Sequence, residues 1–206
     1  MAASSGGLAY GPLGEGCLHL CVDMQRLFEA GAPWAIPWMD KVLPVIEAIA
    51  ARHTGATVFT RFIPARRPGE GVGAWARYYE RWADVTLENL DPQLVNLVPS
   101  LARLVPPAKV LDKWVYSPWT EGRLDVMLRS TRIHTLVITG GETDVCVLAT
   151  VLGAIDRGYR VVIVTDAVCG SADPTHDALM GVYRTRFSTQ VEAADAETVL
   201  SAWRVA

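Results

Sequence analysis

The chain has 206 residues, of which half are hydrophobic and 20% are charged, the balance of one ordinary globular domain. The formal net charge of −3 excludes the basic surface that nucleic-acid binding requires. The longest uncharged stretches are Met1–Gly14, rich in glycine and serine, and Val145–Ile155. Neither has the ~18 consecutive apolar residues of a membrane-spanning helix, so we expect no membrane partner.

The amino-terminal stretch lacks the positive n-region and the apolar core of a signal peptide. We therefore expect residues 1–16 to be a flexible leader and residues 17–206 to be a single domain. We also expect a cytoplasmic protein whose cysteines are reduced thiols.

Short apolar runs alternate with helical patterns along the chain. The predicted strands cover Cys17–Val22, Thr57–Phe62, Lys109–Asp112, His134–Thr139, Arg160–Thr165 and Gln190–Ala193. The predicted helices cover Trp38–Arg52, Glu121–Arg129, Thr143–Arg157, Asp173–Phe187 and Asp195–Trp203. Nearly continuous apolar strands between helices are typical of a parallel sheet covered on both faces. The sequence therefore predicts a three-layer α/β/α sandwich.

Cys17, His19 and Cys21 alternate in the first predicted strand and raise the question of a metal site. Side chains two apart on a strand project in parallel at a spacing of ~6.6 Å. Zinc ligands must instead converge to within ~2.0–2.3 Å of one point. Small thiols packed on the face of the sheet are the better interpretation.

The stretch Pro64–Pro107 is irregular, with the glycine-rich run GEGVG followed by Trp75, Tyr78, Tyr79 and Trp82. These glycines do not lie between a strand and a helix, as a phosphate-binding loop requires. A flap over a pocket or a subunit contact is the better interpretation. Because exposed aromatic surface of this kind tends to be an interface, we expect a homodimer or a homotetramer.

Polar side chains follow the predicted strands where a parallel sheet binds its ligands, beyond the carboxyl ends. Asp23, Arg61 and Lys113 end or follow the first three strands, Cys146 follows the fourth, and Asp166 ends the fifth. A carboxylate, an ammonium and a thiol from separate strand ends are therefore expected to meet at one edge of the sheet.

These groups suit nucleophilic catalysis. We expect Cys146 to lie in the first turn of a helix capped by Thr143, where the helix dipole and Lys113 would lower the pKa of its thiol. Asp23 could accept the thiol proton, and backbone N–H groups could hold an oxyanion. The alternative is that Asp23 caps a helix, Lys113 is a surface charge and Cys146 is a small core residue.

Three segments resemble the isochorismatase-like cysteine hydrolases, the superfamily of nicotinamidases, N-carbamoylsarcosine amidases and ureidoacrylate amidohydrolases. They are CVDMQ around Asp23, LDKWVYSPW around Lys113, and ITGGETDVCVLATVLGAIDRGYRVVIVTDAV around Cys146. The resemblance spans roughly Leu18 to Trp203. It implies an Asp23–Lys113–Cys146 triad and a six-stranded parallel sheet in the order 3-2-1-4-5-6.

The resemblance also implies a cis peptide between Gly141 and Glu142, which turns the N–H groups of Glu142 and Cys146 toward the substrate carbonyl oxygen. The later segment DPTHDAL fits the same family, with His176 as a structural residue at a helix start.

The implied activity is hydrolysis of a C–N bond in a small amide or carbamoyl compound, because isochorismatase proper cleaves a vinyl ether without the cysteine nucleophile. The alternative is a non-catalytic protein that binds a small molecule on the same scaffold. A nucleotide-binding Rossmann protein would carry GxGxxG after the first strand, and the absence of this motif here makes that class a poor match. A haloacid-dehalogenase-type phosphatase would carry Asp-x-Asp, whereas this chain has Asp23-Met24-Gln25.

Three residues are candidates for substrate binding, each with a structural alternative. Arg61 could anchor a substrate carboxylate or pair with an acidic residue of the protein. Glu142 could face an ammonium or amide donor of the substrate, or pair with an arginine. Trp119, like Trp34, Trp38, Trp75 and Trp114, could line an aromatic pocket, or belong to the core or a subunit contact.

Metal-dependent nicotinamidases carry an Asp-x-His cluster after the second strand, where this chain reads TRFIPARRPG. We therefore expect neither a catalytic metal nor another cofactor. Treatment with a chelator should leave turnover unchanged in an assay of ammonia release. Reversible loss of activity that zinc or iron restores would contradict this expectation.

Overall fold

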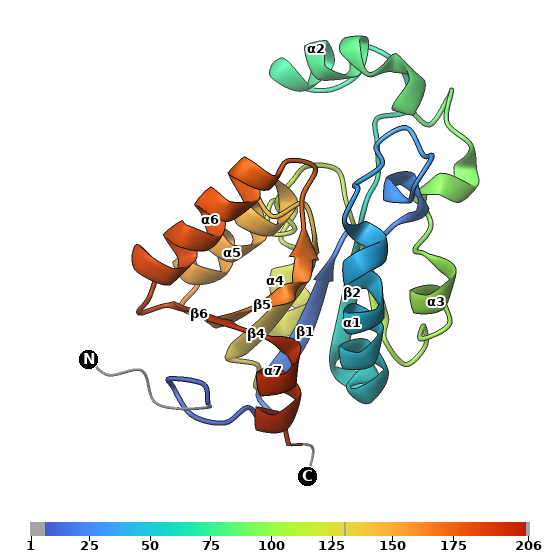
Figure 1. Ribbon diagram of the computed structural model, residues 1–206. Coiled ribbons are helices and arrows are strands. Elements are labelled where there is room, and N and C mark those ends of the chain that lie inside the picture. Colours follow the sequence, from blue (N-terminus) through green and yellow to red (C-terminus); the bar gives the residue numbers. More distant parts are fainter. Residues whose placement is uncertain (1–6, 130, 205–206) are drawn as a thin grey trace.

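A single sheet organises the protein, whose computed structural model describes residues 7–129 and 131–204. Its six strands are all parallel and lie in the order β3-β2-β1-β4-β5-β6 (Figure 1). The strands are β1 (Cys17–Val22), β2 (Thr57–Phe62), β3 (Lys109–Lys113), β4 (Thr135–Gly141), β5 (Arg160–Cys169) and β6 (Val191–Ala194). The predicted fold class and strand order are confirmed.

Helices cover both faces of this sheet (Figure 1). They are α1 (Met39–Arg52), α2 (Ala74–Arg81), α3 (Pro99–Ala102), α4 (Arg123–Arg129), α5 (Cys146–Asp156), α6 (Asp173–Thr185) and α7 (Ala196–Ala202), with short 3-10 turns at Arg26–Phe28, Thr54–Ala56, Ala83–Val85 and Pro92–Val95. Within the described ranges, no helix is long and apolar enough to cross a membrane.

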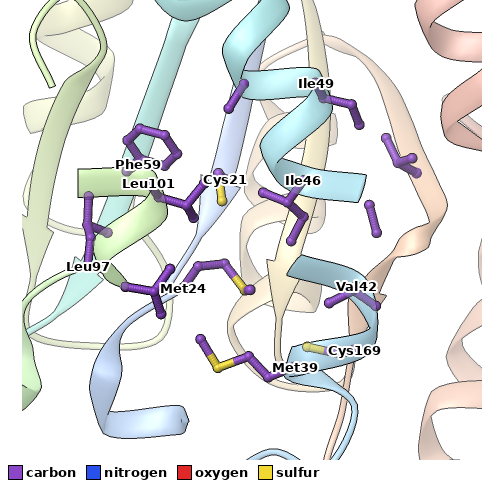
Figure 2. Close-up of a cluster of buried hydrophobic side chains, with 14 of the residues drawn as sticks. Cys21, Met24, Met39, Val42, Ile46, Ile49, Phe59, Leu97, Leu101 and Cys169 are labelled. Carbon is purple, nitrogen blue, oxygen red and sulfur yellow. The ribbon is translucent and has the colours of Figure 1, made fainter. Parts of the chain in front are cut away.

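Strand alternation divides the core into two layers. One set of strand side chains packs with α1, α3 and α7 (Figure 2), and the other set packs with α4, α5 and α6. In β4, for example, Val137 faces the first layer, whereas Leu136 and Ile138 face the second. Every residue of β4 is buried. Side chains on both faces of the strand are therefore covered, as expected for a parallel strand with helices on both sides.

The Cys17–His19–Cys21 alternation belongs to the first layer. Cys17 and Cys21 pack as apolar side chains. His19 is fully buried, and its ring nitrogens lie 3.3 Å from Thr57 Oγ1 and 2.8 Å from Thr139 Oγ1. Burial, with a smaller contribution from His53, lowers the pKa of His19 to about 3, so this imidazole is neutral. Its role is structural.

The predicted leader makes defined contacts over part of its length. The Leu13 N–H donates to the Ala202 carbonyl, and the Tyr10 hydroxyl donates to the Ser188 carbonyl. Leu13 is buried, so this part of the segment is anchored to the C-terminal elements of the domain. Residues 1–6 lie outside the described residues.

The second layer includes a close contact between α5 and Trp119. The indole Nε1–H of Trp119 donates to the Thr150 carbonyl at 3.0 Å. The ring lies against Gly153, where an added Cβ would come within 2.2 Å of Trp119 Cδ1. A residue without a side chain is therefore required at this point of the helix.

We expect Gly153→Ala to destabilise the protein by ~1–3 kcal/mol, because the new methyl group overpacks the Trp119 site. Gly181→Ala in α6 is the matched control, since nothing lies within 4 Å of the added Cβ. That change should stabilise the protein by ~0.5–1 kcal/mol, as helix-interior Gly→Ala usually does. Urea midpoints followed by far-ultraviolet circular dichroism measure both effects. Shifts of the same sign would contradict the prediction.

Candidate active site

Neighbouring strands bring three of the predicted residues together at the carboxyl edge of the sheet. Asp23 follows β1, Lys113 ends β3, and Cys146 begins α5 after β4. β1 and β4 are adjacent at the centre of the sheet, where the strand order reverses. Gly140 permits their close approach, since it has φ +103° and an added Cβ would lie 2.0 Å from the Val22 carbonyl oxygen.

Asp23 and Lys113 form a fully buried ion pair. Lys113 Nζ lies 2.7 Å from Asp23 Oδ2, and the two side chains are 0% and 1% exposed. Lys113 Nζ also donates to the Val115 carbonyl at 3.2 Å. Burial alone would lower the pKa of Lys113, but Asp23 and Cys146 raise it, and the net shift is upward. Lys113 is therefore a permanent cation, and the surface-charge alternative is wrong.

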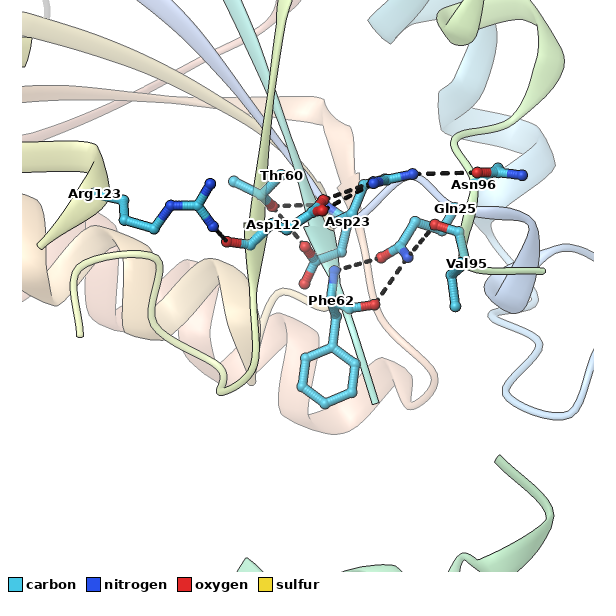
Figure 3. A network of polar contacts seen from close by, with 9 residues as sticks. Asp23, Gln25, Thr60, Phe62, Val95, Asn96, Asp112 and Arg123 are labelled. Carbon is cyan, nitrogen blue, oxygen red and sulfur yellow. Dashed lines mark hydrogen bonds and ion pairs between the residues drawn. The ribbon is translucent and has the colours of Figure 1, made fainter. Parts of the chain in front are cut away.

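Thr60 and Gln25 hold Asp23 and its turn in place (Figure 3). Thr60 Oγ1 accepts from the Asp23 N–H at 3.1 Å and lies 2.5 Å from Asp23 Oδ1, to which it donates. The Gln25 side chain bonds the Phe62 N–H, the Phe62 carbonyl and the Val95 carbonyl. Asp23 has φ +50°, a conformation uncommon for residues other than glycine, and these bonds fix it.

Cys146 is the first residue of α5 and is buried next to Asp23 and Lys113. Its pKa differs from the expected lowered value. Burial raises the pKa of the Cys146 thiol, the Asp23 carboxylate raises it further, and Lys113 opposes both effects. The resting thiol is therefore neutral, because desolvation outweighs the helix terminus and the lysine.

Thr143 is not the helix cap that the sequence predicted. The residue before α5 is Val145, and no side chain caps this end of the helix. The Thr143 N–H and hydroxyl instead donate to the Cys169 carbonyl at 2.8 and 3.0 Å, and His176 Nδ1 lies 2.9 Å from the hydroxyl oxygen. Thr143 thus fastens the turn before Cys146 to the end of β5, and His176 has the structural role expected.

These contacts depend on β5, which continues past its predicted end at Thr165 to Cys169. The register between β4 and β5 shifts between two pairs, Ile138 with Ile163 and Gly140 with Val168. Residues 164–167 of β5 therefore bulge from the β4–β5 ladder. Asp166, which the sequence placed among the polar strand ends, accepts a hydrogen bond from the Ala196 N–H at the start of α7.

Several backbone N–H groups of the turn, among them those of Glu142, Asp144 and Cys146, have no acceptor among the described residues. The peptide bond between Gly141 and Glu142 is cis, as the resemblance implied. Within the described part of the chain, neither the Glu142 N–H nor the Cys146 N–H has an acceptor. The Glu142 and Cys146 N–H groups, which the resemblance implied as donors, are therefore available to a bound carbonyl oxygen.

A cavity of about 330 Å³ opens in front of Cys146. Its lining combines six aromatic rings with the turn before α5: Phe28, Trp34, Ala35, Phe62, Tyr78, Trp82, Tyr116, Gly141, Glu142, Val145, Cys146 and Ser171. Tyr78 and Trp82 come from α2 and its C-terminal end, so of the two interpretations of this segment the flap over a pocket agrees with the structure. An association of subunits stays a prediction.

The structure places Arg61 away from this cavity. Its Nε lies 2.7 Å from Asp112 Oδ1 and its Nη2 lies 2.9 Å from Asp112 Oδ2, while Nη1 donates to Asn96. Alternation along β2 explains this position: Thr60 faces Asp23, so Arg61 points to the other face. It lines a separate hollow. Of the two alternatives for Arg61, the structure therefore shows the ion pair within the protein and not an anchor for a substrate carboxylate.

Of the other two predicted substrate-binding residues, only Glu142 lines the cavity. Trp119 belongs to the core, where it packs on α5. Glu142 Oε2 accepts from the Ser171 N–H at 2.8 Å. Among the described residues no arginine pairs with Glu142, and no group of three or more His, Cys, Asp and Glu residues is placed to hold a metal ion.

Comparison with known proteins identifies the family. Residues 17–195 match the isochorismatase domain, and the chain belongs to the isochorismatase-like hydrolase superfamily. The sequence is 29% identical to N-carbamoylsarcosine amidase of Arthrobacter over 145 residues, which are 68% of this chain and 54% of that protein. It is 26% identical to nicotinamidase 3 of Arabidopsis thaliana, over 78% of this chain and 77% of that protein.

Solved structures agree in fold. A cysteine hydrolase from Pseudomonas syringae superimposes with a TM-score of 0.77 at 22% identity, covering 97% of this chain and all of that one. N-carbamoylsarcosine amidase from Thermoplasma acidophilum gives a TM-score of 0.69 at 22% identity, covering 88% and 96% of the two chains.

The raised pKa of Cys146 predicts how this thiol reacts with iodoacetamide. Alkylation should accelerate steadily with pH, without a plateau near the ordinary thiol pKa of ~8.5. Asp23→Asn should speed alkylation at pH 7.5, by about tenfold for each unit by which the pKa falls, because a negative charge is removed. Mass spectrometry of the Cys146 peptide measures the rate, with Cys146→Ala as background. A plateau below pH ~7 would mean a preformed thiolate.

Proposed function

We propose that this protein is a cysteine amidohydrolase that cleaves a C–N bond in a small amide or carbamoyl compound. The observation that carries the proposal is the buried Asp23–Lys113 pair beside the Cys146 thiol, which lines a cavity sized for a small molecule. The relatedness to N-carbamoylsarcosine amidase and nicotinamidase supports the same chemistry.

Asp23 is the proposed general base. The thiol retains its proton in the resting protein, so activation must accompany attack: the Cys146 proton passes to Asp23 as Sγ bonds to the substrate carbon. Lys113 remains protonated throughout. Its positive charge stabilises the Asp23 carboxylate before the transfer and the developing thiolate during it.

The tetrahedral intermediate places its negative oxygen on the free N–H groups of Glu142 and Cys146. Such donors act in a site from which water is largely excluded, where each is worth ~3–4 kcal/mol of transition-state stabilisation. Collapse of the intermediate breaks the C–N bond, and the proton held by Asp23 goes to the leaving amine or ammonia. A thioester, or a thiocarbamate from a carbamoyl substrate, stays on Cys146.

Water completes the cycle. Asp23, ionised again, takes a proton from a water molecule as its oxygen attacks the thioacyl carbon, and the same donor pair holds the second oxyanion. The C–S bond then breaks, and the thiolate recovers the proton from Asp23. The net reaction consumes one water and yields an acid and an amine, with carbamate as the acid for a carbamoyl substrate.

We expect Cys146→Ala to abolish turnover while leaving the fold intact, because alanine fits the space of the thiol. The assay is ammonia release from a panel of primary amides, ureas and carbamoyl amino acids, with circular dichroism to check folding. Trapping of the acyl group on the Cys146 peptide by acid quench and mass spectrometry is the second measurement. Retention of more than a few per cent of the wild-type rate would remove Cys146 from the mechanism.

The same panel separates catalysis from ligand binding alone. If the wild-type protein binds members of the panel but neither releases ammonia nor becomes acylated, it is a non-catalytic binding protein. Thr60→Val is a further probe, since it removes the hydroxyl that orients Asp23 but leaves the three proposed catalytic groups. It should lower kcat by roughly tenfold or more, with little effect on KM.

A further inference from the structure

The cavity in front of Cys146 has one formally charged side chain in its lining, the carboxylate of Glu142. Among the described residues, no lysine, arginine or histidine lines it. The cation next to the nucleophile, Lys113, is neutralised by Asp23 at 2.7 Å. The lining therefore favours a ligand with a positive group and disfavours one with a carboxylate.

Glu142 is available to such a ligand. Its Oε2 accepts a hydrogen bond from the Ser171 N–H, which fixes the carboxylate in the wall. No lysine, arginine or histidine of the described part of the chain forms an ion pair with it. Arg61, the conspicuous arginine of the strand ends, is engaged on the other face by Asp112.

Aromatic rings form most of the remaining wall, and Trp34 is their centre. The Trp34 ring contacts four others at centroid distances of 5.9 to 6.3 Å: Phe28, Phe62, Tyr78 and Trp82. The faces of such rings are negative and attract ammonium groups within ~6 Å of the centroid. Two lining rings already have such a contact: the exposed Arg81 guanidinium lies 5.6 Å from the Trp82 ring, and Lys113 Nζ lies 5.3 Å from the Phe62 ring.

We propose that the substrate carries an ammonium or a quaternary alkylammonium group, held by the Glu142 carboxylate and the surrounding rings while its amide or carbamoyl carbon lies at Cys146. This inference rests on the proposed amidohydrolase function and specifies its substrate class. It is opposite in charge to the carboxylated substrate that Arg61 would have anchored, because Arg61 pairs with Asp112 and the charged side chain of the lining is Glu142.

Three small amides test the inference by calorimetry on Cys146→Ala, which binds without turnover. Betaine amide carries a trimethylammonium group, 3,3-dimethylbutanamide is its neutral isostere with carbon in place of nitrogen, and succinamate carries a carboxylate. Betaine amide should bind roughly tenfold more tightly than the neutral isostere, and succinamate more weakly than either. Equal affinities, or a preference for succinamate, would overturn the inference.

The double variant Cys146→Ala/Glu142→Gln assigns the effect to its residue. Glutamine keeps the shape of the side chain and an acceptor for the Ser171 N–H but removes the charge, so the preference for betaine amide should fall to a few-fold at most. Cys146→Ala/Glu121→Gln is the matched control, because Glu121 is exposed and does not line the cavity. Selectivity that survives Glu142→Gln would show that Glu142 does not recognise the cation.

Turnover by the wild-type protein keeps the two proposals distinguishable. Selective binding of betaine amide without hydrolysis of any amide would reject the amidohydrolase function and leave the cation preference standing. Hydrolysis of neutral and acidic amides with kcat/KM values equal to that of betaine amide would reject the cation preference and leave the hydrolase standing.

Discussion

The ion pair between Asp23 and Lys113 is the interaction on which the site depends. Two charges placed in the interior of a protein each lose their hydration, and only a close partner with further hydrogen bonds offsets that cost. Here the offset comes from Thr60 on one side and from the Val115 carbonyl on the other. Loss of either partner would leave a buried charge alone, at a cost of ~3–5 kcal/mol.

This pair also sets the electrostatics of the nucleophile. The carboxylate and the ammonium shift the pKa of the Cys146 thiol in opposite directions, and desolvation, the largest cause, raises it and keeps the proton in place. A neutral thiol beside a base reacts slowly with alkylating agents and oxidants, whereas a thiolate that is ionised in the resting protein reacts readily with both. The proposed chemistry therefore begins only when a carbonyl group and its oxyanion donors make transfer of the proton favourable.

Much of the fold was accessible from the sequence, because long apolar runs separated by helical patterns leave few arrangements other than a covered parallel sheet. The convergence of Asp23, Lys113 and Cys146 followed from the rule that ligands bind at strand ends. The two alternatives for Arg61 could not be separated from the sequence, because its partner, Asp112, lies opposite it only in the register of β2 and β3. The bulge in β5 and the role of Thr143 likewise depend on long-range pairing.

The raised pKa of Cys146 was not predicted, and an aromatic pocket was only one of the alternatives, for a related reason. Burial of a helix terminus is decided by what packs over it, and the covering rings come from distant segments such as the Trp34 loop and α2. The Trp75–Trp82 pattern was visible in the sequence, but the irregular stretch around it gave no periodicity from which to place Tyr78 and Trp82 over the nucleophile. Tyr116 had no distinguishing signal other than its position just after Lys113.

The turn before α5 and helix α2 both contribute to the cavity wall, but they differ in how they are attached to the rest of the fold. The floor, formed by the turn before α5, is bound to β4, β5 and α6 through Thr143, so changes there disturb the sheet. The part contributed by α2 and Trp82 stands apart from the sheet (Figure 1) and meets the rest of the wall through ring contacts with Trp34 and Tyr116. Substitutions in α2 can therefore change which molecules fit the cavity while the positions of the reacting groups stay the same. In evolutionary terms, selectivity and catalysis occupy separable segments of one small domain, and new selectivities are accessible through a single helix.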